Sequence, residues 1–255
     1  MEFQKSQNSM LIGGLQKFSL LDYPERVSAI IFTQGCNFRC RFCYNPMLVW
    51  PAVVGKSIYA PGPEAGRQKD HPAYKEDDLF VFLKSRAGKL DAVVITGGEP
   101  CLQPDLPEFI RKIKALGFLV KLDTNGSYPA MLKRLLDEKL IDYIAMDLKA
   151  PAEKYKEVIG VKIDFNNIKK SVKLIIESGL PYEFRTTVAP GLINQDDIAA
   201  MGEIIKGADK WYLQNFKSNM ELLDRALNGR VPYNARQMQE MAEIGREYVK
   251  KCEVR

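Results

Sequence analysis

The sequence predicts an α/β fold, built as a partial, open (βα)6 TIM-like barrel with mostly parallel strands. Short apolar segments recur along the chain, segments with helical spacing separate them, and polar residues follow the ends of several apolar segments. This alternation predicts parallel strands joined by right-handed crossovers. Because a complete TIM barrel has eight strands and we count six, we expect an open barrel. We expect residues 1–255 to form a single domain.

The expected strands are short runs of apolar and β-branched residues. They span residues 26–34, 91–96, 118–123, 141–149, 182–188 and 210–216. Helices are expected near residues 76–87, 105–116, 128–139, 153–158, 166–178, 195–206 and 235–250. Residues 51–74 are rich in proline, glycine and charge, which predicts an irregular inserted loop.

Composition narrows the class of protein. The chain has 255 residues with a net charge of +5, an excess that does not by itself indicate a nucleic-acid partner. No apolar run reaches the roughly 18 residues of a membrane span. The first ten residues, MEFQKSQNSM, lack the apolar region of a secretory signal. We therefore expect a cytoplasmic protein that binds neither membrane nor nucleic acid.

Three of the five cysteines lie close together after the first expected strand, with the spacing Cys36-x3-Cys40-x2-Cys43. Thiolates on so short a loop can each bind one iron of a cubane cluster, which leaves one iron open to another ligand. Zinc also accepts thiolates, but a structural zinc site needs four ligands, and His71 is the single histidine. Cys101 is expected to be a small buried residue.

Glycine and acidic residues follow the second and third expected strands. Gly97 and Gly98 let the backbone approach a ligand closely, and Glu99 adds an acceptor for a cationic group. Asp123 and Thr124 begin an Asp-Thr-Asn-Gly turn. By themselves these segments also fit ordinary turns.

Charged residues mark the later strands. Asp147 and Lys149 alternate along one strand and so share a face. Arg185 lies in a strand expected to be buried, where its charge needs an anion. Gln214 and Asn215 end the sixth strand and are further candidates. Because sites in parallel α/β folds gather at the carboxyl ends of strands, we expect these groups to converge.

The cysteine motif, with the aromatic Phe42 before its last cysteine, and the Gly-Gly-Glu after the second strand resemble the radical SAM superfamily. The resemblance implies a [4Fe–4S] cluster whose open iron binds the amino and carboxylate groups of S-adenosylmethionine (SAM). An electron from the cluster then cleaves SAM to methionine and a 5′-deoxyadenosyl radical. It also implies that Gly97, Gly98 and Glu99 receive the SAM ammonium. Phe42 is expected to shield the cluster or contact the adenine.

Seven segments narrow the resemblance: IGGLQKFSLLDYP, FTQGCNFRC, TGGEP, LDTNG, MDLKAP, RTTVAPG and YVKKCEVR. Together they resemble the glycyl-radical-enzyme activases, most of all the anaerobic ribonucleoside-triphosphate reductase-activating proteins. The resemblance implies that Asp147 and Lys149 contact the SAM ribose and that Arg185 holds its carboxylate. In one subgroup of these activases the Asp-Thr of this motif helps to bind a monovalent cation near SAM, and whether Asp123 and Thr124 bind one here is left open.

The resemblance implies two partners: a glycyl radical enzyme, such as an anaerobic ribonucleotide reductase, and a reductant such as flavodoxin or ferredoxin. Tyr44 departs from the family, which often has histidine there; we expect it to contact the cofactors by hydrogen bonding and stacking. One alternative is a small-molecule radical SAM enzyme similar to the deazaguanine synthases. Another is an electron carrier or zinc module, which leaves the strand-end motifs unexplained.

Overall fold

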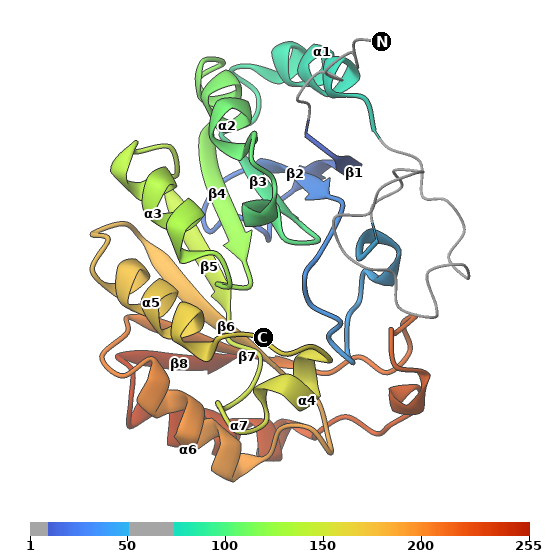
Figure 1. Cartoon of the computed structure of the whole chain (residues 1–255), viewed down its shortest axis with the longest axis vertical. Coiled ribbons are helices and arrows are strands. Elements are labelled where there is room, and N and C mark those ends of the chain that lie inside the picture. The colour runs from blue at the N-terminus through green and yellow to red at the C-terminus, as the bar shows by residue number, and fades with distance from the viewer. Residues whose placement is uncertain (1–9, 51–73) are drawn as a thin grey trace, which may run out of the picture.

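The computed structural model describes residues 10–50 and 74–255, which form a single eight-stranded sheet in the order β1 to β8 (Figure 1). The strands are β1 (Ile12–Ser19), β2 (Ser28–Thr33), β3 (Ala92–Gly97), β4 (Leu119–Thr124), β5 (Tyr143–Asp147), β6 (Tyr182–Val188), β7 (Lys210–Asn215) and β8 (Lys251–Val254). Strands β2 to β7 are parallel, as the sequence predicts. The sheet ends at β1 and β8, so the barrel is open.

Helices connect the parallel strands, and all of the expected ones are present. They are α1 (Glu76–Arg86), α2 (Leu106–Lys114), α3 (Pro129–Asp137), α4 (Tyr155–Ile159), α5 (Phe165–Ile176), α6 (Gln195–Ile204) and α7 (Ala235–Arg246). Local sequence explains several starts: Asn194 and Asn234 form capping boxes with Asp197 and Gln237. Figure 1 shows α2, α3, α5 and α6 outside the curved sheet. Within the described ranges, no helix has both the length and the apolar character that crossing a bilayer requires.

Two edge strands were not among those expected from the sequence. Strand β1 comes from the polar segment before the first expected strand and pairs antiparallel with β2. Strand β8 pairs parallel with β7, and its one buried residue is Cys252. Edge strands are half solvated, so their sequences lack the apolar runs of the inner strands. The expected inserted loop, apart from Tyr74, lies outside the described residues.

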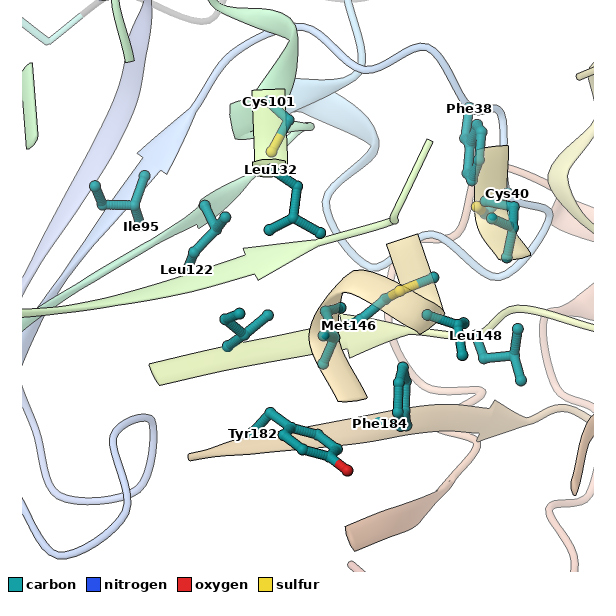
Figure 2. Close-up of a cluster of buried hydrophobic side chains, with 14 of the residues drawn as sticks. Phe38, Cys40, Ile95, Cys101, Leu122, Leu132, Met146, Leu148, Tyr182 and Phe184 are labelled. Carbon is teal, nitrogen blue, oxygen red and sulfur yellow. The ribbon is translucent and has the colours of Figure 1, made fainter. Parts of the chain in front are cut away.

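The two faces of the sheet have different environments. On the outer face, Leu122, Met146 and Phe184 occupy three successive strands and share one cluster with Leu132 of α3 (Figure 2). On the inner face, a second cluster includes Tyr23, Ile30, Ala92, Val94 and Tyr143. Because side chains alternate along a strand, the charged residues between the outward-facing ones point to the inner face. The functional groups therefore face the interior of the open barrel.

Candidate functional site

A cavity of about 820 Å³ lies on the inner face of the sheet. Every residue that the sequence predicts as a metal ligand or cofactor contact lines it: Cys36, Cys40, Phe42, Cys43, Tyr44, Gly97, Gly98, Glu99, Asp123, Thr124, Asp147, Lys149 and Arg185. Gln214 and Asn215 line it as well. Residues far apart in the sequence thus meet because each follows or ends a parallel strand. The volume is in the range of small-molecule and cofactor sites.

Backbone contacts fix the cysteine loop that follows β2. The Cys36 N–H donates to the Val49 carbonyl at 3.0 Å, and the Arg39 N–H donates to the Ile159 carbonyl at 2.8 Å. Gly160, at the end of α4, has a φ of +69°, and a Cβ there would lie 2.7 Å from the Arg39 carbonyl oxygen. The backbone of the loop is therefore held by hydrogen bonds to Val49 and Ile159, independently of its thiols.

The three thiols of the loop form a donor set suited to iron. Burial raises the pKa of Cys36, Cys40 and Cys43, for Cys40 to about 12, although the Lys149 charge lowers the pKa of the latter two. Stable thiolates here need added positive charge, which a cluster supplies. Among the described residues, no three Cys, His, Asp or Glu side chains are placed to share a single metal ion. His71, the alternative zinc ligand, lies outside these residues.

The Gly-Gly-Glu segment after β3 packs directly against the cysteine loop. A Cβ at Gly98 would lie 2.1 Å from the Gly35 carbonyl oxygen, and one at Gly97, where φ is +111°, would lie 2.4 Å from the Thr33 nitrogen. The sequence interpretation assigned this close approach to a ligand. The structure shows that close packing against the backbone of Thr33 and Gly35 already requires glycine at both positions. Both glycines also line the cavity.

Glu99 connects the β3 and β4 strand ends from a buried position. Its Oε1 accepts hydrogen bonds from the Cys101 N–H at 3.0 Å and the Thr124 hydroxyl at 2.7 Å. Its Oε2 accepts one from the Asn125 N–H at 2.7 Å. Burial raises the pKa of Glu99, and these hydrogen bonds oppose that rise. The Thr124 hydroxyl thus helps to hold the Glu99 carboxylate in position.

A chain of alternating charges crosses the inner face of β4, β5 and β6. Lys121 Nζ donates to Asp123 Oδ1 at 2.8 Å, and Arg185 NH1 donates to Asp123 Oδ2 at 3.0 Å. Arg185 Nε donates to Asp147 Oδ1 at 2.9 Å, and Lys149 Nζ donates to Asp147 Oδ2 at 2.9 Å. We call these five residues the ion chain. Its three cations and two carboxylates leave one positive charge in surplus.

The ion chain holds its carboxylates ionised. Burial alone would raise the pKa of Asp123, but the charges of Arg185 and Lys121 outweigh it and lower that pKa. In the same way Arg185 and Lys149 hold the pKa of Asp147 well below its ordinary value. Burial would lower the pKa of Lys149, yet Asp147 raises it. Asp123, Asp147 and Lys149 are therefore charged at neutral pH.

Two aromatic residues of the cysteine loop take different places. The ring of Phe42 is buried, and Lys149 Nζ lies 5.8 Å from its centroid. Tyr44 stacks on Phe216 with ring centroids 6.4 Å apart, and its hydroxyl accepts a hydrogen bond from the Lys217 N–H. Tyr44 thus links the cysteine loop to the segment after β7. Cys101 is buried, as expected.

Sequence reasoning missed three residues that build the site. Lys121 is 2% exposed and pairs with Asp123. Asn125 Nδ2 donates to Asn37 Oδ1 at 3.0 Å, which joins the Asp-Thr-Asn-Gly turn to the cysteine loop. The signal for Lys121 was a lysine inside an apolar strand, two residues before an aspartate and hence on the same face. Asn37 and Asn125 carried no signal beyond their place in motifs.

Comparisons with known proteins agree with this geometry. The model of the family described as "Radical SAM superfamily" matches residues 30–204, more than half of the chain. A protein of Methanocaldococcus jannaschii, named as a glycyl-radical enzyme activating enzyme, is 31% identical over 250 residues, covering 96% of this chain and 95% of that protein.

Two solved structures share the fold. Streptococcus suis SuiB bound to its precursor peptide SuiA has a TM-score of 0.61 at 15% identity; the match covers 89% of this chain and 48% of SuiB, so this chain spans about half of SuiB's length. A domain of pyruvate-formate lyase-activating enzyme from Bacteroides vulgatus has a TM-score of 0.51 at 17% identity, covering 65% of this chain and 99% of that domain.

Proposed function

The chain belongs to the radical SAM superfamily, and from this premise we propose that it activates glycyl-radical enzymes. The observation that carries the proposal is the similarity to the M. jannaschii protein named for that activity, which extends over nearly the full length of both chains. The proposal assigns the chain a protein substrate: the glycine of a partner enzyme, from whose Cα a hydrogen atom is removed.

The chain is a radical SAM enzyme and uses a [4Fe–4S] cluster and SAM. When bound, these cofactors supply a one-electron cleavage of SAM to methionine and a 5′-deoxyadenosyl radical, which takes a hydrogen atom from the substrate. Cys36, Cys40 and Cys43 would hold the cluster, because they are the clustered thiols that line the cavity.

The ion chain and Glu99 would orient SAM. The surplus positive charge of the ion chain supports binding of the SAM carboxylate near Arg185, since guanidinium and carboxylate form strong charge-assisted hydrogen bonds. Lys149 and Asp147 lie beside it and would contact the ribose. Glu99, buried and held by three donors, adds a negative charge to the cavity lining, where the SAM ammonium group would bind.

The open sheet supports a polypeptide substrate. In the described ranges β1 and β8 are the two edges of the sheet, so the strands do not enclose the cavity on all sides. The lining of the cavity extends from the cysteine loop to Leu21 and Asp22, between β1 and β2, and to Arg255 after β8. A cavity that reaches both sheet edges can admit a loop of another protein more readily than a closed barrel can.

We further propose an anaerobic ribonucleotide reductase as the partner and a flavodoxin or ferredoxin as the electron donor. The segments quoted in the sequence analysis support this choice by their resemblance to reductase activases. A glycyl radical is stable enough to record, so the product identifies the function.

The decisive experiment starts from protein whose cluster has been reconstituted anaerobically. Reductant, SAM and a candidate reductase with deuterium at its glycine Cα are added, and electron paramagnetic resonance and mass spectrometry follow the products. We expect a glycyl radical signal that is a doublet with unlabelled reductase and collapses with the deuterated one, together with deuterium in 5′-deoxyadenosine, and none of these with Cys36→Ala. Formation of 5′-deoxyadenosine without a glycyl signal or deuterium transfer from any candidate would contradict the proposal.

A further inference from the structure

The ion chain decides whether Asp123 and Thr124 need a monovalent cation, as the matching residues do in one subgroup of the activases. Both oxygens of Asp123 already accept hydrogen bonds from side-chain cations, Lys121 at 2.8 Å and Arg185 at 3.0 Å. The Thr124 hydroxyl donates to Glu99 at 2.7 Å. The Thr124 oxygen also accepts a hydrogen bond from the Gly126 N–H at 3.1 Å. Each oxygen of Asp123 thus already has one cationic donor, so the chain itself supplies positive charge at this carboxylate.

The neighbouring carboxylate gives the same result. Asp147 accepts from Arg185 through one oxygen and from Lys149 through the other, each at 2.9 Å. Hard cations bind through several oxygen ligands at once, and carboxylates are the strongest of these. At this end of β4 and β5, each carboxylate of the ion chain is shared between two protein cations.

Charge balance also disfavours an added ion. The ion chain carries a surplus positive charge without one. A free cation bound to Asp123 would lie close to the ammonium group of Lys121, which is 2% exposed, although the buried Glu99 and Glu183 also line the cavity. Like charges repel strongly at such depth because little water screens them.

We propose that the ammonium group of Lys121 takes the place of the monovalent cation, so that this enzyme binds SAM without Na⁺ or K⁺. A lysine ammonium is a compact point charge with three donors, which resembles a small monovalent ion more than a guanidinium does. It is covalently held, and its position is fixed by Asp123 and by the Tyr143 ring, whose centroid lies 5.8 Å from Nζ. The inference rests on SAM binding in the cavity and not on the identity of the protein substrate.

The test measures SAM affinity of the cluster-loaded protein by equilibrium dialysis, with no partner enzyme present. Buffers of equal ionic strength contain tetramethylammonium, Na⁺ or K⁺ chloride. The wild-type dissociation constant is expected to agree among the three salts within about twofold. Tighter binding by the wild type in Na⁺ or K⁺ than in tetramethylammonium would overturn the inference.

Lys121→Met is the informative variant, because methionine ends near the lysine Cε and leaves the position of the ammonium empty. Its SAM binding should be weakened in tetramethylammonium and restored about tenfold by Na⁺ or K⁺, a usual size for coupling between two bound ligands. Adding Asp123→Asn should abolish this restoration, since the anion that attracts the cation is then gone. Equal weakening of Lys121→Met in all three salts would contradict the inference.

Lys114→Met is the matched control. Lys114 also pairs with a carboxylate, Asp142, at 2.7 Å, but both side chains are partly exposed and lie outside the cavity lining. This variant should bind SAM like the wild type and show no salt preference. A salt preference in this control equal to that of Lys121→Met would contradict the assignment to Lys121.

A second readout needs neither cluster nor SAM. The thermal unfolding midpoint of the cluster-free Lys121→Met protein should rise by about 2–4 °C on exchanging tetramethylammonium for K⁺, and the wild-type midpoint should not move.

If Lys121→Met does not fold, thallium NMR of the wild-type protein is the test instead, with Tl⁺ as the probe for K⁺. A bound thallium signal that SAM alters would overturn the inference, and its absence would support it. Normal SAM binding without a glycyl radical would contradict the proposed partner alone.

Discussion

The Tyr44 hydroxyl accepts a hydrogen bond of 2.8 Å from the backbone N–H of Lys217. This bond, together with the stacking of Tyr44 on Phe216, joins the loop of the cluster ligands to the segment that follows β7. Sequence reasoning placed Tyr44 among the cofactor contacts. The geometry gives it a second task, which is to hold the far end of the cysteine loop in place.

Tyr44→Phe should therefore lower the free energy of unfolding while leaving the iron content of the reconstituted protein nearly unchanged. The substitution keeps the ring on Phe216 but leaves the Lys217 N–H without its acceptor, a loss of about 0.5–1.5 kcal/mol. Urea unfolding of the cluster-free protein measures the change in unfolding free energy, and iron content after reconstitution measures cluster binding. Loss of the cluster at unchanged stability would show that the hydroxyl acts on the cofactors instead.

Replacing any one of Cys36, Cys40 and Cys43 by alanine should prevent stable cluster binding, because the remaining two thiols cannot hold three irons. Iron and sulfide analysis and the visible absorption spectrum measure the outcome. Cys252→Ala is the control, since this thiol is fully buried and does not line the cavity. Equal iron loss in Cys252→Ala would mean that the losses come from misfolding.

Gly98→Ala should destabilise the protein and disturb the cysteine loop, because its Cβ would meet the Gly35 carbonyl oxygen at 2.1 Å. The expected loss in unfolding free energy is about 1–3 kcal/mol, accompanied by a lower iron content. Gly14→Ala in β1 is matched to it, since its nearest neighbour is Phe32 at 3.9 Å. A Gly98→Ala protein as stable as Gly14→Ala would contradict the packing described here.

The ion chain should make stability fall with acidification. The pKa values of Asp123 and Asp147 are lowered in the folded protein, so their stabilising contribution is present above the unfolded pKa and is lost as pH falls. The free energy of unfolding should thus decrease as pH falls below the unfolded aspartate pKa of about 3.9 and should go on decreasing toward the lowered pKa values of the folded protein. Urea unfolding at several pH values measures this dependence.

Asp147→Asn tests the origin of that pH dependence. It should lower stability at pH 7 by about 1.5–3 kcal/mol, because Arg185 and Lys149 lose a partly buried anion, and should flatten the acid slope. Asp209→Asn is the control, since Asp209 pairs with the exposed Lys250. An acid slope in Asp147→Asn as steep as in the wild type would assign the effect to other carboxylates.

The inner strands could be predicted because burial on both faces demands short apolar runs, as in residues 91–96. Strand β8 could not be predicted, because only Cys252 of Lys251–Val254 is buried, so the segment lacks an apolar run. Pairing with β7 stabilises it instead. The site residues at strand ends were predictable because parallel strands bring their ends together. Lys121 was missed because its burial depends on a carboxylate partner, and local sequence does not reveal which charges will pair.

The sheet order, in which each strand lies beside its neighbour in the chain, has a consequence for how the protein folds. Pairing of sequential neighbours keeps contact order low for a parallel sheet, so closure of each new loop costs little entropy. The sheet can grow strand by strand from the amino-terminal end during synthesis. Lys121 and Asp123 are placed with β4, and Arg185 arrives only with β6. The ion pairs that Arg185 makes with Asp123 and Asp147 thus form late in folding, after most of the apolar sheet has formed.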